Sequence, residues 1–201
     1  MLIPQLQRLG HESVCVDLPN DPAASATVYA EVIAEKTPRH RSDLTVVAHS
    51  ASGLFLPLVS AQRLVFLAAV IPQPGISLLD QLKAAPQMMN PQWLGKNPVN
   101  DDQIAHQFLF HDCAPETAAW ALTTRRLTNA RQAMFEKCPL KAWPAVPSTY
   151  ILCTGDRTIQ PEWSRQAARE RLGCEALELP GGHCPHVARP RELAEMLARL
   201  D

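Results

Sequence analysis

The sequence has few aromatic residues and no long apolar run. Phe, Trp and Tyr make up 5% of its 201 residues. No stretch approaches the ~20 consecutive apolar residues that a membrane-spanning helix needs. Gln5, Gln7 and Arg8 interrupt the first residues, and no signal-peptide cleavage pattern follows. These absences indicate a protein that does not associate with a membrane.

The sequence also lacks an excess of either charge, and its cysteines lack paired spacing. The net charge is −1, which gives no reason to expect a nucleic-acid partner. Six cysteines are scattered without the CxxC or HExxH patterns of metal sites, so we expect no metal and no cofactor. Free cysteines are typical of a reducing compartment, which favours a cytoplasmic location. Cys15 and Cys153 lie in apolar, strand-like runs and are predicted to be buried thiols.

The chain alternates short apolar runs with helical patterns, as an α/β domain does. With 46% hydrophobic residues, it is long enough for one domain with a sizeable core. Helices are predicted at both ends of the chain, over 1–9 and 190–200, and after Pro161. A further helix is predicted over 27–36, with Thr27 as its cap and Val28, Val32 and Ile33 facing inward. Strands joined by helices predict a parallel sheet with right-handed crossovers. The predicted strands cover residues 13–18, 44–47, 63–71, 148–153 and 175–179.

Residues 76–147 break this alternation and look like a cap-like insertion within a single domain over 1–201. Pro and Asn punctuate residues 86–100, and helical patterns follow at about 102–109 and 115–127. Trp93, Trp120 and Trp143 fall in this segment. They either line an apolar pocket or fill the insertion's own small core.

Residues 44–53 have the pattern of a nucleophile elbow. An apolar strand leads to Ser50, and small residues stand two positions before and after it, Ala48 and Ser52. In such a strand–turn–helix unit the Ser50 hydroxyl is lifted off the sheet, and the Ala51 N–H faces a developing oxyanion. A helix over 54–59 is expected to follow. The alternative is that Ser50 only caps that helix.

Two more chemically useful side chains, those of Asp156 and His183, follow predicted strands. The carboxyl ends of parallel strands meet at one edge, where sites form. There His183 would take the Ser50 proton, and Asp156 would orient the imidazole. Asp156 is alternatively a plain turn residue, and His186 competes with His183. For His111 and Asp112, a place on the surface or in the core of the insertion is favoured over one that reaches the pocket.

Three segments resemble the α/β-hydrolase superfamily, in its small-esterase branch with plant methyl-esterases and hydroxynitrile lyases. They are residues 46–53, residues 150–156 with the Pro-Glu-Trp step at 161–163, and residues 182–185. The resemblance implies a mostly parallel sheet flanked by helices, with Ser50 as nucleophile, Asp156 as acid and His183 as base. It also implies a small-molecule ester substrate. Gly before His183 and Pro two residues after it match the family, which favours His183 over His186.

The sequence departs from this family at two places. Cys184 stands where the lyases carry lysine, which favours ester hydrolysis over cyanohydrin cleavage. The family's first strand and its oxyanion loop, which supplies a second donor, have no counterpart. That strand would lie between the 13–18 and 44–47 strands. Loss of one such donor lowers rates about 100- to 1000-fold.

This gap leaves several hypotheses open. Either Met1 is an internal start of a longer protein, which the intact motifs favour, or the chain is an impaired remnant. A non-catalytic binding module is the main alternative to a serine hydrolase, and a lyase or cofactor-free oxygenase is a third. The sequence does not indicate an oligomeric state.

Overall fold

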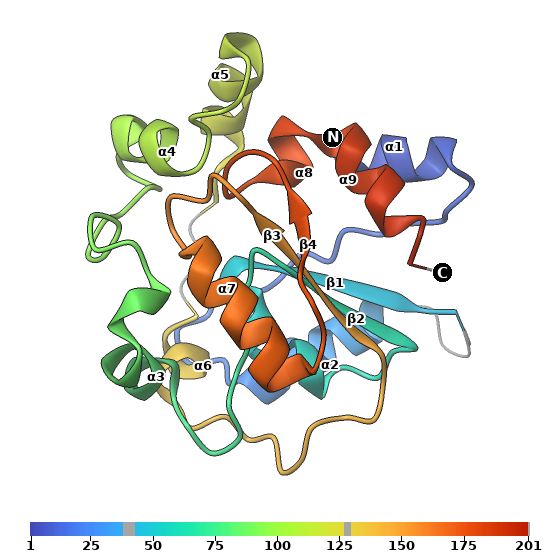
Figure 1. Ribbon diagram of the computed structural model, residues 1–201, viewed down its shortest axis with the longest axis vertical. Helices are drawn as coiled ribbons and strands as arrows, with labels where there is room; N and C mark the ends of the chain where they lie inside the picture. The colour runs from blue at the N-terminus through green and yellow to red at the C-terminus, as the bar shows by residue number, and fades with distance from the viewer. Residues whose placement is uncertain (38–42, 127–129, 201) are drawn as a thin grey trace.

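Four parallel strands form the centre of the computed structural model, which describes residues 1–37, 43–126 and 130–200 (Figure 1). Helices cover both faces of the sheet, so the predicted α/β-hydrolase architecture of a parallel sheet flanked by helices is confirmed. The strands lie in the spatial order of the chain, β1-β2-β3-β4. They are β1 (Thr45–His49), β2 (Arg63–Leu67), β3 (Ser148–Cys153) and β4 (Leu177–Leu179).

The two faces of the sheet are apolar because alternate side chains of the buried strands point in opposite directions. From β2, Val65 and Leu67 pack with α1 (Leu2–Arg8) and α9 (Pro190–Leu197). Leu64 and Phe66 face the larger core, together with α2 (Ala26–Lys36) and α7 (Pro161–Ala167). The first and last helices therefore cover one face together, and Figure 1 shows α1 beside α9.

Residues 13–18 were predicted to be a strand, and this prediction is wrong. Within the described residues this segment pairs with no strand, and Val14 is 65% exposed. Cys15 is exposed as well, whereas Cys153 on β3 is buried as expected. An apolar alternation becomes a strand only where a neighbouring strand accepts its hydrogen bonds. Here β1 is the first strand of the sheet, and residues 13–18 pass beside the sheet without joining it.

The cap of α2 also differs from the prediction. The Ser25 hydroxyl, not that of Thr27, accepts a hydrogen bond from the Val28 N–H at 3.3 Å, and the helix begins at Ala26. The cap lies two residues earlier than predicted, and the inner face of the helix differs as well. Ile33 is buried as predicted, but Val28 is 40% exposed, and Tyr29 lies inside in its place.

The segment 76–147 contributes helices and, in its described part, no strand. Its middle contains the two predicted helices, although the predicted end of the second, at residue 127, lies outside the described residues. Residues 88–90 pair with residues 158–160 through an isolated antiparallel bridge. Figure 1 shows α4 and α5 beyond the carboxyl ends of β3 and β4. The helices are α3 (Leu78–Ala84), η3 (Pro86–Met88), α4 (Asp102–Phe108), α5 (Pro115–Thr124) and α6 (Arg131–Phe135).

The three tryptophans of this segment do not share one environment. Trp93 lies against Phe108 with ring centroids 5.5 Å apart. Trp143 stacks on Phe66 of β2 and joins the main core, whereas Trp120 is 46% exposed. The three tryptophans therefore neither line one pocket together nor fill one core of the insertion.

The C-terminal part follows the prediction closely. β3 and β4 lie within the predicted strands, and α7 continues into a π-helical turn, η4 (Ala168–Leu172), before Gly173. A short helix, α8 (Pro185–Ala188), was not predicted. Within the described ranges, every helix is too short or too polar to cross a bilayer.

Candidate active site

Ser50 stands directly after β1 in a strained turn. Its φ is 57°, a left-handed value that residues other than glycine rarely adopt. The turn is held by the Val70 N–H, which donates to the Ser50 carbonyl at 3.1 Å, and by the Ser52 hydroxyl, which donates to the His49 carbonyl at 2.6 Å. Strain of this kind persists where the surroundings enforce it, and it is frequent at functional sites.

The predicted α-helix over 54–59 is not formed. Two short 3₁₀ helices follow instead, η1 (Ser50–Leu54) and η2 (Leu56–Leu58). Pro57 explains the difference, because it has no N–H to donate to the carbonyl of Gly53 and so interrupts an α-helical ladder. Ala51 is the second residue of η1, among the N–H groups that a helix start leaves without a helical partner.

The three predicted site residues meet in one chain of hydrogen bonds. The Ser50 Oγ lies 2.9 Å from the His183 Nε2, and the His183 Nδ1 lies 2.8 Å from the Asp156 Oδ2. They come from the turn after β1, the loop after β3 and the loop after β4, so the parallel sheet brings them to one edge. His183 is only 3% exposed. Buried in this way, the imidazole is held to the two partners on its ring nitrogens.

Asp156 is fixed by its own loop. Its Oδ1 accepts hydrogen bonds from the Thr158 N–H at 2.7 Å and the Ile159 N–H at 3.2 Å. These bonds leave the Oδ2 pointing at His183. The prediction that Asp156 is only a turn residue is therefore incomplete, because the turn orients the carboxylate toward the imidazole.

Thr158 is a site residue that sequence reasoning missed. Its buried hydroxyl donates to the Asp156 Oδ1 at 3.0 Å, and its oxygen lies 2.8 Å from the His183 Nδ1. A hydroxyl that donates to the carboxylate can accept from the ring N–H at the same time. Its position two residues after an aspartate is typical of a turn in which the side chain bonds back to the loop. The two-residue spacing of Asp156 and Thr158 is therefore the sequence feature that indicates this contact.

His49 and His186 form a neutral layer behind His183. The His49 Nε2–H donates to the His183 carbonyl at 2.7 Å, and the His49 ring lies 4.6 Å from that of His183 and 4.7 Å from that of His186. Burial, with the nearby histidines, lowers the pKa of His49 well below its usual value. Burial likewise lowers the pKa of His186 to about 4. Of the two candidate histidines, His183 is the one that bonds to Ser50 and Asp156.

His111 and Asp112 are partly exposed residues of the insertion, and the expectation of a surface or insertion-core position leaves out their contacts with the site loops. The His111 Nε2 lies 3.2 Å from the Gly155 carbonyl, and the Asp112 Oδ2 accepts a hydrogen bond from the Gly182 N–H at 2.8 Å. Both side chains therefore reach the loops that carry Asp156 and His183. Their position depends on the fold of a long insertion, which local sequence patterns do not specify.

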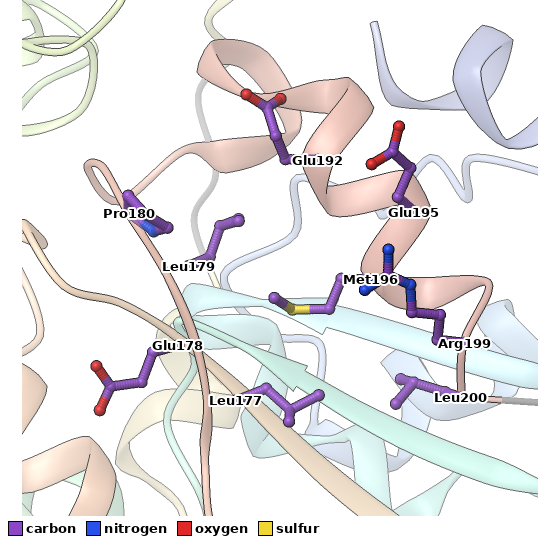
Figure 2. A pocket seen from close by; sticks show the side chains of 9 residues that line it. All are labelled: Leu177, Glu178, Leu179, Pro180, Glu192, Glu195, Met196, Arg199 and Leu200. Carbon is purple, nitrogen blue, oxygen red and sulfur yellow. The ribbon is translucent and has the colours of Figure 1, made fainter.

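Two surface pockets lie away from this chain of hydrogen bonds. A groove of about 510 Å³ runs between β4 and α9, with Leu177 and Met196 among its lining residues (Figure 2). A smaller pocket of about 310 Å³ lies beside Trp163 and Met89. Neither is lined by Ser50, Asp156 or His183. In the described residues, no group of three or more His, Cys, Asp or Glu side chains is arranged to hold a metal ion.

Comparisons with known proteins identify the family and structures with a similar fold. The chain is 24% identical over 227 residues to the alpha/beta hydrolase nvfD of Aspergillus novofumigatus, covering 98% of this chain and 88% of the relative. Its fold is similar to that of polyneuridine aldehyde esterase, with a TM-score of 0.79, 21% identity and coverage of 99% and 91% of the two chains. It is also similar to the methylesterase MES16 from Arabidopsis, with a TM-score of 0.72, 17% identity and coverage of 99% and 90%. The model of the alpha/beta hydrolase family matches residues 2–196, and the chain belongs to that family.

Proposed function

We propose that this chain is a serine hydrolase that cleaves small carboxylic esters through an acyl-enzyme on Ser50. The observation that carries the proposal is the hydrogen-bonded order Ser50–His183–Asp156 at the carboxyl edge of the sheet. A neutral serine hydroxyl is a weak nucleophile, and an adjacent imidazole held by a carboxylate is the common way to activate it. The likeness to two proteins named as esterases supports an ester substrate.

Acylation begins when the Ser50 Oγ attacks the ester carbonyl carbon. The Ser50 proton passes to the His183 Nε2, and the carbonyl oxygen becomes an oxyanion that accepts a hydrogen bond from the Ala51 N–H. Asp156 stabilises the resulting imidazolium through the His183 Nδ1–H. The tetrahedral intermediate then expels the alcohol, which takes the proton from His183 Nε2 and leaves an ester on Ser50.

Deacylation reverses these roles with water. His183 removes a proton from the water as its oxygen attacks the acyl carbon, and the same Ala51 N–H stabilises the second oxyanion. Collapse returns the proton to the Ser50 Oγ and releases the carboxylic acid. No cofactor takes part, because every proton in the cycle moves between substrate, water, Ser50 and His183.

Cys184 favours hydrolysis over the lyase reaction of related proteins. Its thiol is 6% exposed, and burial raises its pKa well above its usual value, so it is uncharged at neutral pH. A cysteine side chain is never positively charged, and burial excludes the thiolate as well, so the residue after His183 does not replace the lysine expected of the lyases. We propose that the 76–147 segment acts as the cap that selects the ester.

A fluorophosphonate probe tests the nucleophile directly. We expect one adduct, mapped to Ser50 by mass spectrometry, and no adduct on Ser50→Ala or on His183→Ala at the same exposure time. Release of p-nitrophenol from p-nitrophenyl acetate should follow the same pattern. A folded wild-type chain that takes up no probe would refute catalysis by this polypeptide and leave the binding-module hypothesis in its place.

A further inference from the structure

The turn between α4 and α5 reaches into the two loops that carry Asp156 and His183. At this turn His111 and Asp112 leave the insertion and contact backbone groups one residue ahead of each of those side chains. The His111 Nε2 lies 3.2 Å from the carbonyl oxygen of Gly155, the residue before Asp156. The Gly182 N–H, which precedes His183, donates to Asp112. The reaction described above assigns no step to His111 or Asp112.

The loops leave room for this turn because they carry glycine. A Cβ on Gly182 would lie 2.7 Å from both the His111 Nε2 and the Asp112 Oδ1, closer than real Cβ atoms approach. A Cβ on Gly181 would overlap the Asp112 carboxylate and the Arg189 side chain. Larger residues at positions 181 and 182 would therefore collide with the Asp112 side chain in this position.

The surroundings keep Asp112 in this position. Its side chain is only 13% exposed, and the Arg189 Nε lies 3.8 Å from its Oδ2. Burial, with the positive charge of Arg157, lowers the pKa of His111. The Arg157 side chain in turn donates to the Gln107 carbonyl at the end of α4, at 3.0 Å.

Within the described residues, the backbone of residues 181–183 is held by three hydrogen bonds to different parts of the chain. The Gly155 N–H donates to the Gly181 carbonyl at 2.8 Å, and the His49 ring donates to the His183 carbonyl at 2.7 Å. Asp112 supplies the third, and of these three partners it alone belongs to the described part of the 76–147 segment. The loop of Asp156 has further ties to that segment through the pairing of residues 158–160 with 88–90. The base is therefore the part of the triad that depends most on Asp112.

We infer that Asp112 is a positioning residue for His183, through which the 76–147 segment sets the geometry of the catalytic base. The inference rests on the proposed function. When the Asp112 carboxylate accepts the Gly182 N–H, it fixes the peptide that precedes His183 and so the direction of the imidazole toward Ser50. His111 performs the same task more weakly for Asp156, because that loop has other ties.

The test measures fluorophosphonate labelling of Ser50 and steady-state ester hydrolysis in Asp112→Ala and Asp112→Asn. A displacement on the order of 1 Å costs up to about 100-fold in rate, and two of three ties remain, so we expect Asp112→Ala to label about tenfold more slowly. Its kcat should fall while its KM stays within about twofold. Asp112→Asn keeps an amide oxygen that accepts the same N–H and should recover to within about threefold of wild type.

The control is Glu116→Gln, which changes an exposed carboxylate on α5 of the same segment and should leave both rates unchanged. Circular dichroism melting shows which variants are folded. If Asp112→Ala does not fold, Asp112→Ser replaces it, because its shorter hydroxyl does not reach the Gly182 N–H. A folded variant that labels at the wild-type rate overturns the inference and leaves the proposed function standing. Absence of labelling in the wild type refutes the proposed function itself.

Discussion

Gly53 lies where the elbow touches the end of β2, and Gly53→Ala is expected to damage both stability and reactivity. A Cβ on Gly53 would overlap the Val70 carbonyl oxygen and would lie 3.1 Å from the Ala69 Cβ. The Val70 N–H is the donor that holds the Ser50 carbonyl at 3.1 Å. The overlapping carbonyl and the donating N–H lie on either side of the Val70 Cα, so relief of the overlap shifts Val70 and disturbs the hydrogen bond that fixes the nucleophile.

The magnitude follows from two opposing effects. Overpacking of a close backbone contact costs about 1–3 kcal/mol, whereas replacing glycine by alanine gains about 0.5–1 kcal/mol from the unfolded chain. The net loss in the free energy of unfolding is then about 0–2.5 kcal/mol. A shift of Ser50 on the order of 1 Å lowers the rate of fluorophosphonate labelling about 100-fold.

Gly75→Ala provides a control, because it should also lower the free energy of unfolding but lies outside the elbow. Gly75 has a φ of +74° and open space where a Cβ would stand, so alanine there costs about 1–2 kcal/mol of backbone strain without touching the elbow. Urea denaturation measures the stability of both variants, and labelling of Ser50 measures reactivity. The reasoning is refuted if both lose similar stability and Gly53→Ala still labels within threefold of the wild type.

Three further changes test other parts of the structure. Ser25→Ala removes the α2 cap and should lower the free energy of unfolding in urea by about 1 kcal/mol, whereas Thr27→Ala should leave it nearly unchanged. Thr158→Val removes the hydroxyl between Asp156 and His183, worth about 1 kcal/mol, and should slow labelling of Ser50 about fivefold. Between pH 6.5 and 4 the unfolded chain binds a proton on His186 that the folded chain excludes, so stability falls with falling pH, by about 3 kcal/mol from this group. His186→Gln should remove that part of the pH dependence in urea denaturation, and an unchanged slope would contradict it.

The sequence predicts the site well where chemistry and strand ends coincide. Ser50, Asp156 and His183 each follow a short apolar run, and parallel strands necessarily bring such positions to one edge. The hydrogen-bonded contacts around them were not foreseen. Thr158 lies two residues after Asp156, and that spacing is a weak local signal. His49 bonds to a backbone carbonyl 134 residues away, so it leaves no mark on the local pattern.

The errors in the fold have separate physical causes. Residues 13–18 alternate like a strand, but strand formation depends on a neighbour that the local sequence does not describe. The helix predicted over 54–59 should have been rejected on Pro57 alone, since proline removes a hydrogen bond from a helix interior. The cap of α2 was misplaced because Ser25 and Thr27 are both good capping residues, and only tertiary packing of Tyr29 distinguishes them.

Two short 3₁₀ helices stand after Ser50 in place of the predicted α-helix, and this difference has a limited effect on the proposed oxyanion site. A helix macrodipole contributes about 0.3–1 kcal/mol at its first turn, and η1, with five residues, supplies less. A direct N–H donor to an oxyanion is worth about 2.7–4 kcal/mol when it is removed. The direction of the Ala51 N–H, which the Ser50 φ of 57° sets, therefore matters more than the length of the helix behind it. The contacts that enforce this turn, from Val70 and around Gly53, therefore contribute to the proposed reaction by fixing the direction of that N–H.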